Sequence, residues 1–164
     1  MDEGKGSPRV AVRLAGPGDE HLVEAVITEA FAPFRHLYTP EAYAHTAIRA
    51  NDIRERFAEG PIWLAFMGGE PAGTVSGLRD GERFYIRSMG VVPVAQGYGI
   101  GHRLLAALEE HARDEGFNKL YLYTTFVLPR AKPLYEKNGF YILRETPPEE
   151  WFGMAGIEME KVLD

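Results

Sequence analysis

The sequence contains no cysteine among its 164 residues. This absence excludes disulfide bonds, thiolate metal ligands and a cysteine nucleophile. The five histidines show no metal-ligand spacing, so we expect no bound metal. Long hydrophobic runs are absent too. The longest, Ile62 to Met67, is far shorter than the roughly 20 residues that a membrane-spanning helix needs, and no membrane partner is expected.

The N-terminal residues 1–8 are polar and lack the apolar core of a signal peptide. We expect them to be disordered and the protein to be cytoplasmic. The formal charge of −6 at pH 7 argues against nucleic acid as a partner. With 45% hydrophobic and 26% charged residues, and with no repeat or linker, residues 1–164 are expected to form a single domain with a sizeable core.

Hydrophobic periodicity and turn residues predict an alternation of helices and strands along the chain. Asp19 and Thr39 are predicted helix caps, the latter followed by Pro40 at the first helical position. The order β-α-α-β-β-β-α-β-α-β-β predicts a mixed α/β sheet with helices on both faces. The predicted elements are strand 9–14, helix 19–31, helix 39–60, strands 62–67, 71–78 and 83–92, helix 102–115, strand 118–127, helix 129–138, and strands 139–145 and 156–162.

The most informative segment is Gln96 to Gly101, which joins a predicted strand to a predicted helix through three glycines. Glycine permits close backbone approach, and a helix start offers free N–H groups, so the segment favours a phosphate or pyrophosphate ligand. A glycine turn without a ligand is the alternative, disfavoured by three alternating glycines. A dinucleotide fingerprint is set aside, because the spacing is Gly-x-Gly-x-Gly and the strand end at 124–127 carries no acid.

Two segments resemble motifs of the GNAT superfamily of N-acetyltransferases. Gln96-x-x-Gly99-x-Gly101, preceded by the segment 89–93, resembles the coenzyme-A-binding motif of that family. Residues 131–140 resemble its Leu-Tyr-x-x-x-Gly-Phe segment. The resemblance is strong over residues 62–144 and topological before them. It implies a GNAT-type fold: a mixed, mainly antiparallel twisted sheet of about seven strands, with helices on both faces.

The resemblance implies acetyl-CoA as the acyl donor. In the family, the strand before the glycine turn carries a bulge and splays from its neighbour, and the pantetheine arm lies in the resulting cleft. Pro93 lacks an N–H and is expected to end the strand pairing there. Leu128 stands where the family often has an asparagine. The residues that the resemblance assigns to the cofactor are Met89 and Val91 for the pantetheine arm, Gln96, Gly97, Tyr98, Gly99, Ile100, Gly101 and His102 around the pyrophosphate, and Leu128 and Ala131.

For catalysis, Tyr135 aligns with the tyrosine that in many relatives donates a proton to the departing CoA thiolate. The alternative is that it only packs beside Phe140. Some relatives carry a glutamate base on the strand before the turn, but Tyr85 stands there in this chain. A water chain or a base from another element is therefore expected, with Glu82 and His36 as candidates.

By the same resemblance, the acceptor pocket is built from the segment between the first two helices and from the last strands. Aromatic residues there suit an apolar or cation–π surface for an amine, or else cap the core. Arg87 either recognises a carboxylate on the acceptor or pairs with an acid of the protein. The residues assigned to this pocket are Phe34, His36, Tyr38, Tyr85, Arg87 and Trp151.

Together these residues indicate an N-acetyltransferase. The expected reaction transfers acetyl from acetyl-CoA to a primary amine of a small molecule or peptide by direct attack in a ternary complex. The alternative is a catalytically inactive acyl-CoA-binding sensor or interaction module. The resemblance also suggests a homodimer through the last strands, with Trp151 and Phe152 at the contact.

Overall fold

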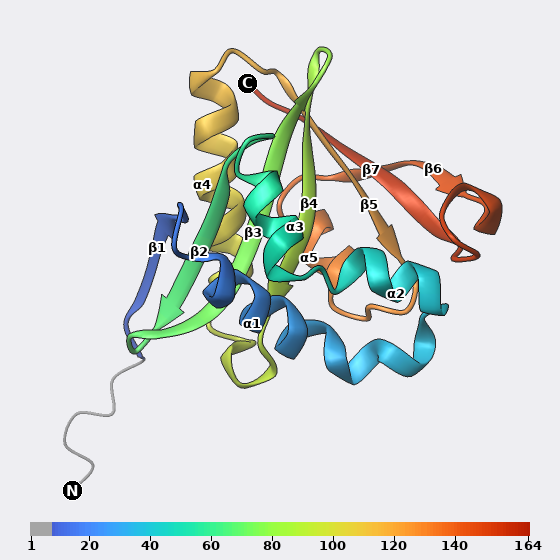
Figure 1. The fold of residues 1–164 in the computed structure, drawn as a ribbon. Helices are drawn as coiled ribbons and strands as arrows, with labels where there is room; N and C mark the ends of the chain where they lie inside the picture. Colours follow the sequence, from blue (N-terminus) through green and yellow to red (C-terminus); the bar gives the residue numbers. More distant parts are fainter. Residues whose placement is uncertain (1–7) are drawn as a thin grey trace, which may run out of the picture.

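The computed structural model describes residues 8–164 and consists of one seven-stranded sheet with helices on both faces (Figure 1). The prediction of disorder for residues 1–8 lies, apart from Pro8, outside the described residues. No helix in the described part is long and apolar enough to span a membrane. The elements are β1 Val10–Leu14, α1 Glu20–Phe31, the 3₁₀ helix η1 Ala32–Leu37, α2 Pro40–Thr46, α3 Ala50–Arg56, β2 Ile62–Met67, β3 Glu70–Asp80, β4 Arg83–Val91, η2 Pro93–Ala95, α4 Ile100–Asp114, β5 Lys119–Thr125, α5 Ala131–Lys137, β6 Tyr141–Thr146, η3 Pro148–Glu150 and β7 Gly156–Val162.

The strand order is β1-β2-β3-β4-β5-β7-β6. All neighbouring strands are antiparallel except β4 and β5, which run parallel and are joined through α4. A parallel pair needs a crossover connection of this kind, whereas an antiparallel pair can be joined by a tight turn, as Gly81 and Glu82 join β3 to β4. The predicted mixed, mainly antiparallel sheet is therefore confirmed.

Two glycines fix which helix covers which face of the sheet. A Cβ on Gly73 of β3 would lie 2.8 Å from the Ile100 side chain of α4, so α4 packs directly on the backbone of this strand. A Cβ on Gly90 of β4 would lie 2.9 Å from Ala30 of α1. Gly90 pairs with the residue after Gly73, and successive residues of a strand face opposite sides. Helices α1 and α4 therefore cover opposite faces.

The sheet opens into a cleft between β4 and β5. These strands pair only over Phe84–Ile86 and Leu120–Leu122, although β4 runs on to Val91 and β5 to Thr125, and they part visibly in Figure 1. Within the cleft, β4 carries one extra residue relative to β3, and Ser88 in this bulge has a φ of 54°. β4 ends at Val91, and the Val92 N–H still donates to the Ala72 carbonyl of β3 at 2.9 Å. Pairing thus stops just before Pro93, as expected from a residue without an N–H.

The expected long helix over residues 39–60 is wrong, since the chain forms two short helices there. Thr39 caps α2 as predicted, accepting a hydrogen bond from the Ala42 N–H at 3.2 Å. The break follows because the start of α3 is fixed from outside the helix: the Ala50 N–H donates to the Glu24 carboxylate of α1 at 2.6 Å. The turn between the helices also buries Ile48, which is 5% exposed.

Asp19 does not cap α1 as predicted. Its carboxylate accepts hydrogen bonds from Arg13, at 2.8 and 3.1 Å, and from the Gly16 N–H, at 3.0 Å. The side chain is thus turned toward β1 and the preceding loop instead of the helix. The Arg13 guanidinium and the Gly16 N–H hold the pKa of Asp19 below its usual value.

Candidate functional site

Two adjoining cavities occupy the cleft where β4 and β5 part. The first, of about 610 Å³, runs from the glycine turn to α5 and is called the glycine cavity. The second, of about 450 Å³, lies between β4, β5 and α2 and is called the tyrosine cavity. Four residues line both of them, so the cavities meet there: Phe31, Met89, Leu128 and Tyr135.

The glycine turn presents its backbone to the glycine cavity. Gly97 and Gly99 have φ values of 88° and 78°, which side-chain-bearing residues rarely adopt, and a Cβ on either would meet nothing within 4 Å. The first bond of α4 runs from the Arg103 N–H to the Gly99 carbonyl, 3.1 Å. The N–H groups of the preceding turn have no partner within the helix and lie at its positive end. The arrangement suits an anion.

The residues predicted to bind the cofactor come together with one exception. Tyr98 does not line the cavity, because its ring points outward and is 47% exposed. Phe34, which the sequence analysis assigned to the acceptor pocket, lines the glycine cavity. Two basic residues that it assigned to neither pocket also line this cavity: Arg130, just before α5, and Lys137, within the motif of residues 131–140. The predicted residues that line the glycine cavity are Met89, Val91, Gln96, Gly97, Gly99, Ile100, Gly101, His102, Leu128 and Ala131.

Tyr135 lies on α5 at the junction of the two cavities. Its ring packs edge-on against Phe140, with 5.7 Å between the ring centroids. The alternative that Tyr135 only packs beside Phe140 therefore accounts for one side of the ring. The residue is 8% exposed. Burial, with a smaller contribution from Tyr38, raises the pKa of the hydroxyl well above its ordinary value. The hydroxyl therefore stays protonated at neutral pH and can donate.

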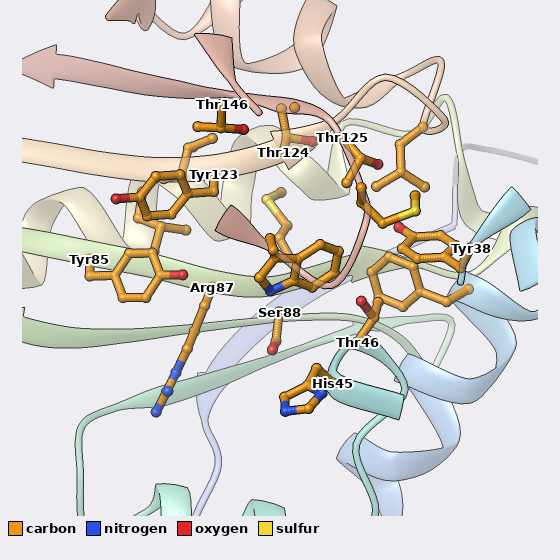
Figure 2. Close-up of a pocket in the computed structure, with 18 of the residues that line it drawn as sticks. Tyr38, His45, Thr46, Tyr85, Arg87, Ser88, Tyr123, Thr124, Thr125 and Thr146 are labelled. Atoms are coloured by element: carbon orange, nitrogen blue, oxygen red, sulfur yellow. The ribbon is translucent and has the colours of Figure 1, made fainter. Parts of the chain in front are cut away.

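The tyrosine cavity is lined mainly by aromatic rings and hydroxyl groups. Figure 2 shows Tyr85 and Tyr123 at one end and Tyr38 with Thr46 at the other. Threonines of β5, together with Thr146, form a further wall. Burial raises the pKa of both Tyr38 and Tyr85, so these phenols are neutral and unsuited to act as bases.

Four of the six residues predicted for the acceptor pocket line the tyrosine cavity, namely Tyr38, Tyr85, Arg87 and Trp151. Phe34 lines the glycine cavity instead, and His36 is exposed and lines neither. The reason is that residues 32–37 coil into the 3₁₀ helix η1, which turns their side chains in different directions.

The two candidate bases, His36 and Glu82, lie outside the tyrosine cavity. Glu82 is exposed in the turn between β3 and β4. Sequence reasoning missed several residues that do line this cavity. They come from four separate segments and carry no local motif: His45, Thr46, Arg56, Ser88 and Tyr123.

Comparison with known proteins identifies the family to which this cleft and its glycine turn belong. The model of the acetyltransferase (GNAT) family matches residues 23–140. This range includes β4 and α5, which line both cavities. This chain belongs to the GNAT family. The resemblance noted in the sequence is thereby confirmed.

Individual GNAT relatives are similar over most of the chain. A mycothiol acetyltransferase of Cellulomonas flavigena is 34% identical over 147 residues, which are 81% of this chain and 41% of the relative. The chain spans about two fifths of the length of this relative, and the same holds for the N-acetyltransferase family 8 member 5 of Mus musculus and the mycothiol acetyltransferase of Catenulispora acidiphila.

Solved GNAT structures share the fold. An acetyltransferase from Desulfovibrio desulfuricans superposes with a TM-score of 0.76 at 20% identity, covering 95% of this chain and 100% of that one. The PaiA N-acetyltransferase of Thermoplasma acidophilum, solved in complex with coenzyme A, has a TM-score of 0.75 at 18% identity, with 94% and 99% coverage.

Proposed function

We propose that this protein is an acetyl-CoA-dependent N-acetyltransferase that acetylates a primary amine by direct attack in a ternary complex. The observation that carries the proposal is the position of Tyr135, a buried neutral phenol where two cavities meet. One cavity has the chemistry of an anion site, and the other, of about 450 Å³, is large enough to hold a second substrate. Membership of the GNAT family supports acetyl transfer as the reaction.

Acetyl-CoA is assigned to the glycine cavity. Its pyrophosphate would lie against the backbone N–H groups of residues 97–102, and its pantetheine arm would run along the unpaired part of β4, using the main chain of Met89 and Val91. The complex of the PaiA relative with coenzyme A supports a GNAT fold as a host for this cofactor. The thioester then lies near Tyr135, where the cavities join.

In the reaction, the amine nitrogen forms a bond to the thioester carbonyl carbon, and the carbon–sulfur bond breaks. A backbone N–H near Val91 would polarise the carbonyl oxygen as charge develops on it. The Tyr135 hydroxyl would donate to the departing thiolate. Because a thiol has a pKa of about 8.5 and a tyrosine about 10, this contact acts as a hydrogen bond and full proton transfer is uphill.

The attacking amine must lose a proton, because alkyl amines have a pKa of about 10.4 and arrive as ammonium ions. Among the described residues, Glu150 is the carboxylate that lines the tyrosine cavity, and it already accepts hydrogen bonds from Arg144 at 2.8 and 3.1 Å. We therefore assign the proton to a water relay through the cavity.

The location in the cytoplasm and the homodimer stay predictions.

The experiment that tests the proposal is release of free CoA thiol from acetyl-CoA in the presence of a panel of primary amines. Amine-dependent release, with the acetylated amine found by mass spectrometry, is the expected result. Calorimetric binding of acetyl-CoA without turnover on any amine would instead favour the inactive sensor, which no finding so far supports. Failure of acetyl-CoA to bind the folded protein would overturn the proposal.

A further inference from the structure

Two arginines, Arg56 and Arg87, lie together at the wall of the tyrosine cavity, and the reaction described above uses neither. Arg56 is the last residue of α3, and Arg87 lies in β4 just before the bulge. Both line the cavity, as does Ser88. Figure 2 shows the side chains of Arg87 and Ser88 leaving β4 toward the same side.

The bulge is what allows this grouping. In a regular strand, successive side chains point to opposite faces, so Arg87 and Ser88 would be separated by the sheet. The φ of 54° at Ser88 is uncommon for a residue other than glycine, and strained backbone of this kind collects at functional sites. The local backbone thus re-aims one side chain so that a hydroxyl and a guanidinium share a wall.

The hydrogen bonds of the group are incomplete. Arg56 Nη1 donates to Ser88 Oγ at 2.5 Å, and the Arg87 guanidinium pairs with the carboxylate of Glu59. The Nε atom of Arg87 is buried and has no hydrogen-bond partner among the described residues. Buried donors are nearly always paired in folded proteins, so this N–H calls for an acceptor beyond those that residues 8–164 supply.

The group formed by Arg56, Ser88 and Arg87 also carries more positive charge than its neighbouring carboxylates balance. Glu59 is the carboxylate that pairs directly with this group, while Asp52 of α3 acts on Arg56 from further away and accepts a hydrogen bond from the Arg49 N–H. Glu150 is held by Arg144. Burial, followed by repulsion from Arg87, lowers the pKa of Arg56 to about 10. The ion pair with Glu59 accounts for one nitrogen of the Arg87 guanidinium, but it leaves the Arg56 charge and the Arg87 Nε–H without a partner among the described residues.

We propose that the acetyl acceptor is a free amino acid and that Arg56, Ser88 and Arg87 bind its carboxylate. This inference rests on the proposed function, since the amine must reach a thioester next to Met89, which lies two residues beyond Arg87. An amine and a carboxylate on one carbon satisfy that short separation. The remaining walls, with Tyr38, Tyr85 and Trp151, suit an apolar or aromatic side chain.

The test compares matched acceptors that differ only in the carboxylate: L-phenylalanine, L-phenylalaninamide and phenethylamine, extended to the other common amino acids and their amides. Thiol release is followed for each. We expect kcat/KM for the best acid to exceed that for its amide by about tenfold or more, because hydrogen bonds between charged partners are the stronger class. Equal or better use of the amides would overturn the inference and leave the acetyltransferase proposal intact.

Substitutions of the arginines test whether they cause the preference for the acid over the amide. Arg87→Gln and Arg56→Gln are expected to raise KM for the acid about tenfold and leave KM for the amide unchanged, whereas Arg79→Gln, on an exposed ion pair with Glu115, changes neither. Glu59→Gln removes the competing carboxylate and is expected to lower KM for the acid. A purely structural role for the ion pair predicts equal losses for acid and amide in Arg87→Gln, Arg56→Gln and Glu59→Gln, which would contradict the inference.

Calorimetric titration of the protein saturated with CoA separates this inference from the proposed function. Binding of L-phenylalanine, or of another acid in the panel, that is tighter than binding of its amide and weakened by Arg87→Gln would support the carboxylate site even without turnover. In that case only the acetyl transfer would fail. Turnover of amines together with no preference for the acid in this titration would remove the carboxylate site and keep the transferase.

Discussion

The two cavities of the cleft are built in different ways. The glycine cavity takes its most specific surface from the backbone of one contiguous segment, residues 96–102. At Gly97 and Gly99 an added Cβ has space but the wrong φ. The tyrosine cavity is built from side chains of α2, α3, β4, β5 and the loop before β7. A site lined by backbone is altered only by those few substitutions that change the local conformation or charge. A site lined by side chains can be altered by a substitution at every lining position. This difference fits a cofactor that is shared within a family and an acceptor that varies from one member to another.

The largest expected effect comes from placing a charge in the backbone-lined site. Gly99→Glu sets a carboxylate at the start of α4, where the pyrophosphate is assigned. Like charges about 4 Å apart repel by roughly 4 kcal/mol at an effective dielectric near 20, so acetyl-CoA affinity should fall by at least about 100-fold. Calorimetric titration measures the loss.

Gly99→Ala is the matched control for that variant. It carries the same strain at a φ of 78°, meets no atom within 4 Å and adds no charge. It should cost stability of about 1 kcal/mol with a much smaller loss of affinity. Equal losses from alanine and glutamate would show that backbone strain, and not repulsion of an anion, decides binding at this turn.

The second effect concerns the junction of the cavities. Tyr135→Phe keeps the packing on Phe140 and removes the hydroxyl that would donate to the CoA thiolate. We expect kcat to fall about tenfold to 100-fold, at the lower end of general-acid effects because a thiolate is a good leaving group. The KM for acetyl-CoA should stay unchanged. A raised KM with unchanged kcat would make the residue a binding group only.

The same residue gives a pH prediction. Burial raises the pKa of Tyr135 above the ordinary value of 10.0, so the protonated donor persists through neutral and mildly alkaline pH. Turnover of the wild type should therefore not decline between about pH 8 and 9.5 through loss of this proton. A decline in that range which Tyr135→Phe abolishes would mean that the hydroxyl ionises far more easily than its burial implies.

A third, smaller effect tests the side-chain-lined cavity. The Trp151 ring lies edge-on to Tyr38, with 6.4 Å between centroids, and both line the tyrosine cavity. Trp151→Ala should raise KM for the acceptor about tenfold, the range of one lost aromatic contact, and leave acetyl-CoA affinity unchanged. A loss of cofactor binding in this variant would show that the two cavities are not independent.

The contrast between the cavities also explains what could be predicted from the sequence. The glycine turn and the segment around Tyr135 are local patterns, and so were identified, together with the strand order and the end of pairing before Pro93. The tyrosine cavity has no local pattern. Arg56 faces it only because the chain breaks between α2 and α3, and Ser88 only because β4 bulges. Both events depend on tertiary contacts, such as the bond from Ala50 to Glu24, which no spacing rule reveals.

The smallest expected effect lies outside both cavities and serves as their reference. Asp19 is bound by Arg13 and the Gly16 N–H, which lower its pKa below the usual value. A lowered folded-state pKa contributes stability that is present above about pH 3.9 and is lost as pH falls through the folded value. In Asp19→Asn, the free energy of unfolding should therefore fall less steeply as the pH is lowered. Because the pair is partly exposed, the loss near pH 7 should be below about 1 kcal/mol. Urea unfolding between pH 2 and 7 measures this loss of stability. Changed kinetic constants for acetyl-CoA or for the acceptor in Asp19→Asn would mean that lower stability alone can produce the effects expected from the cavity variants.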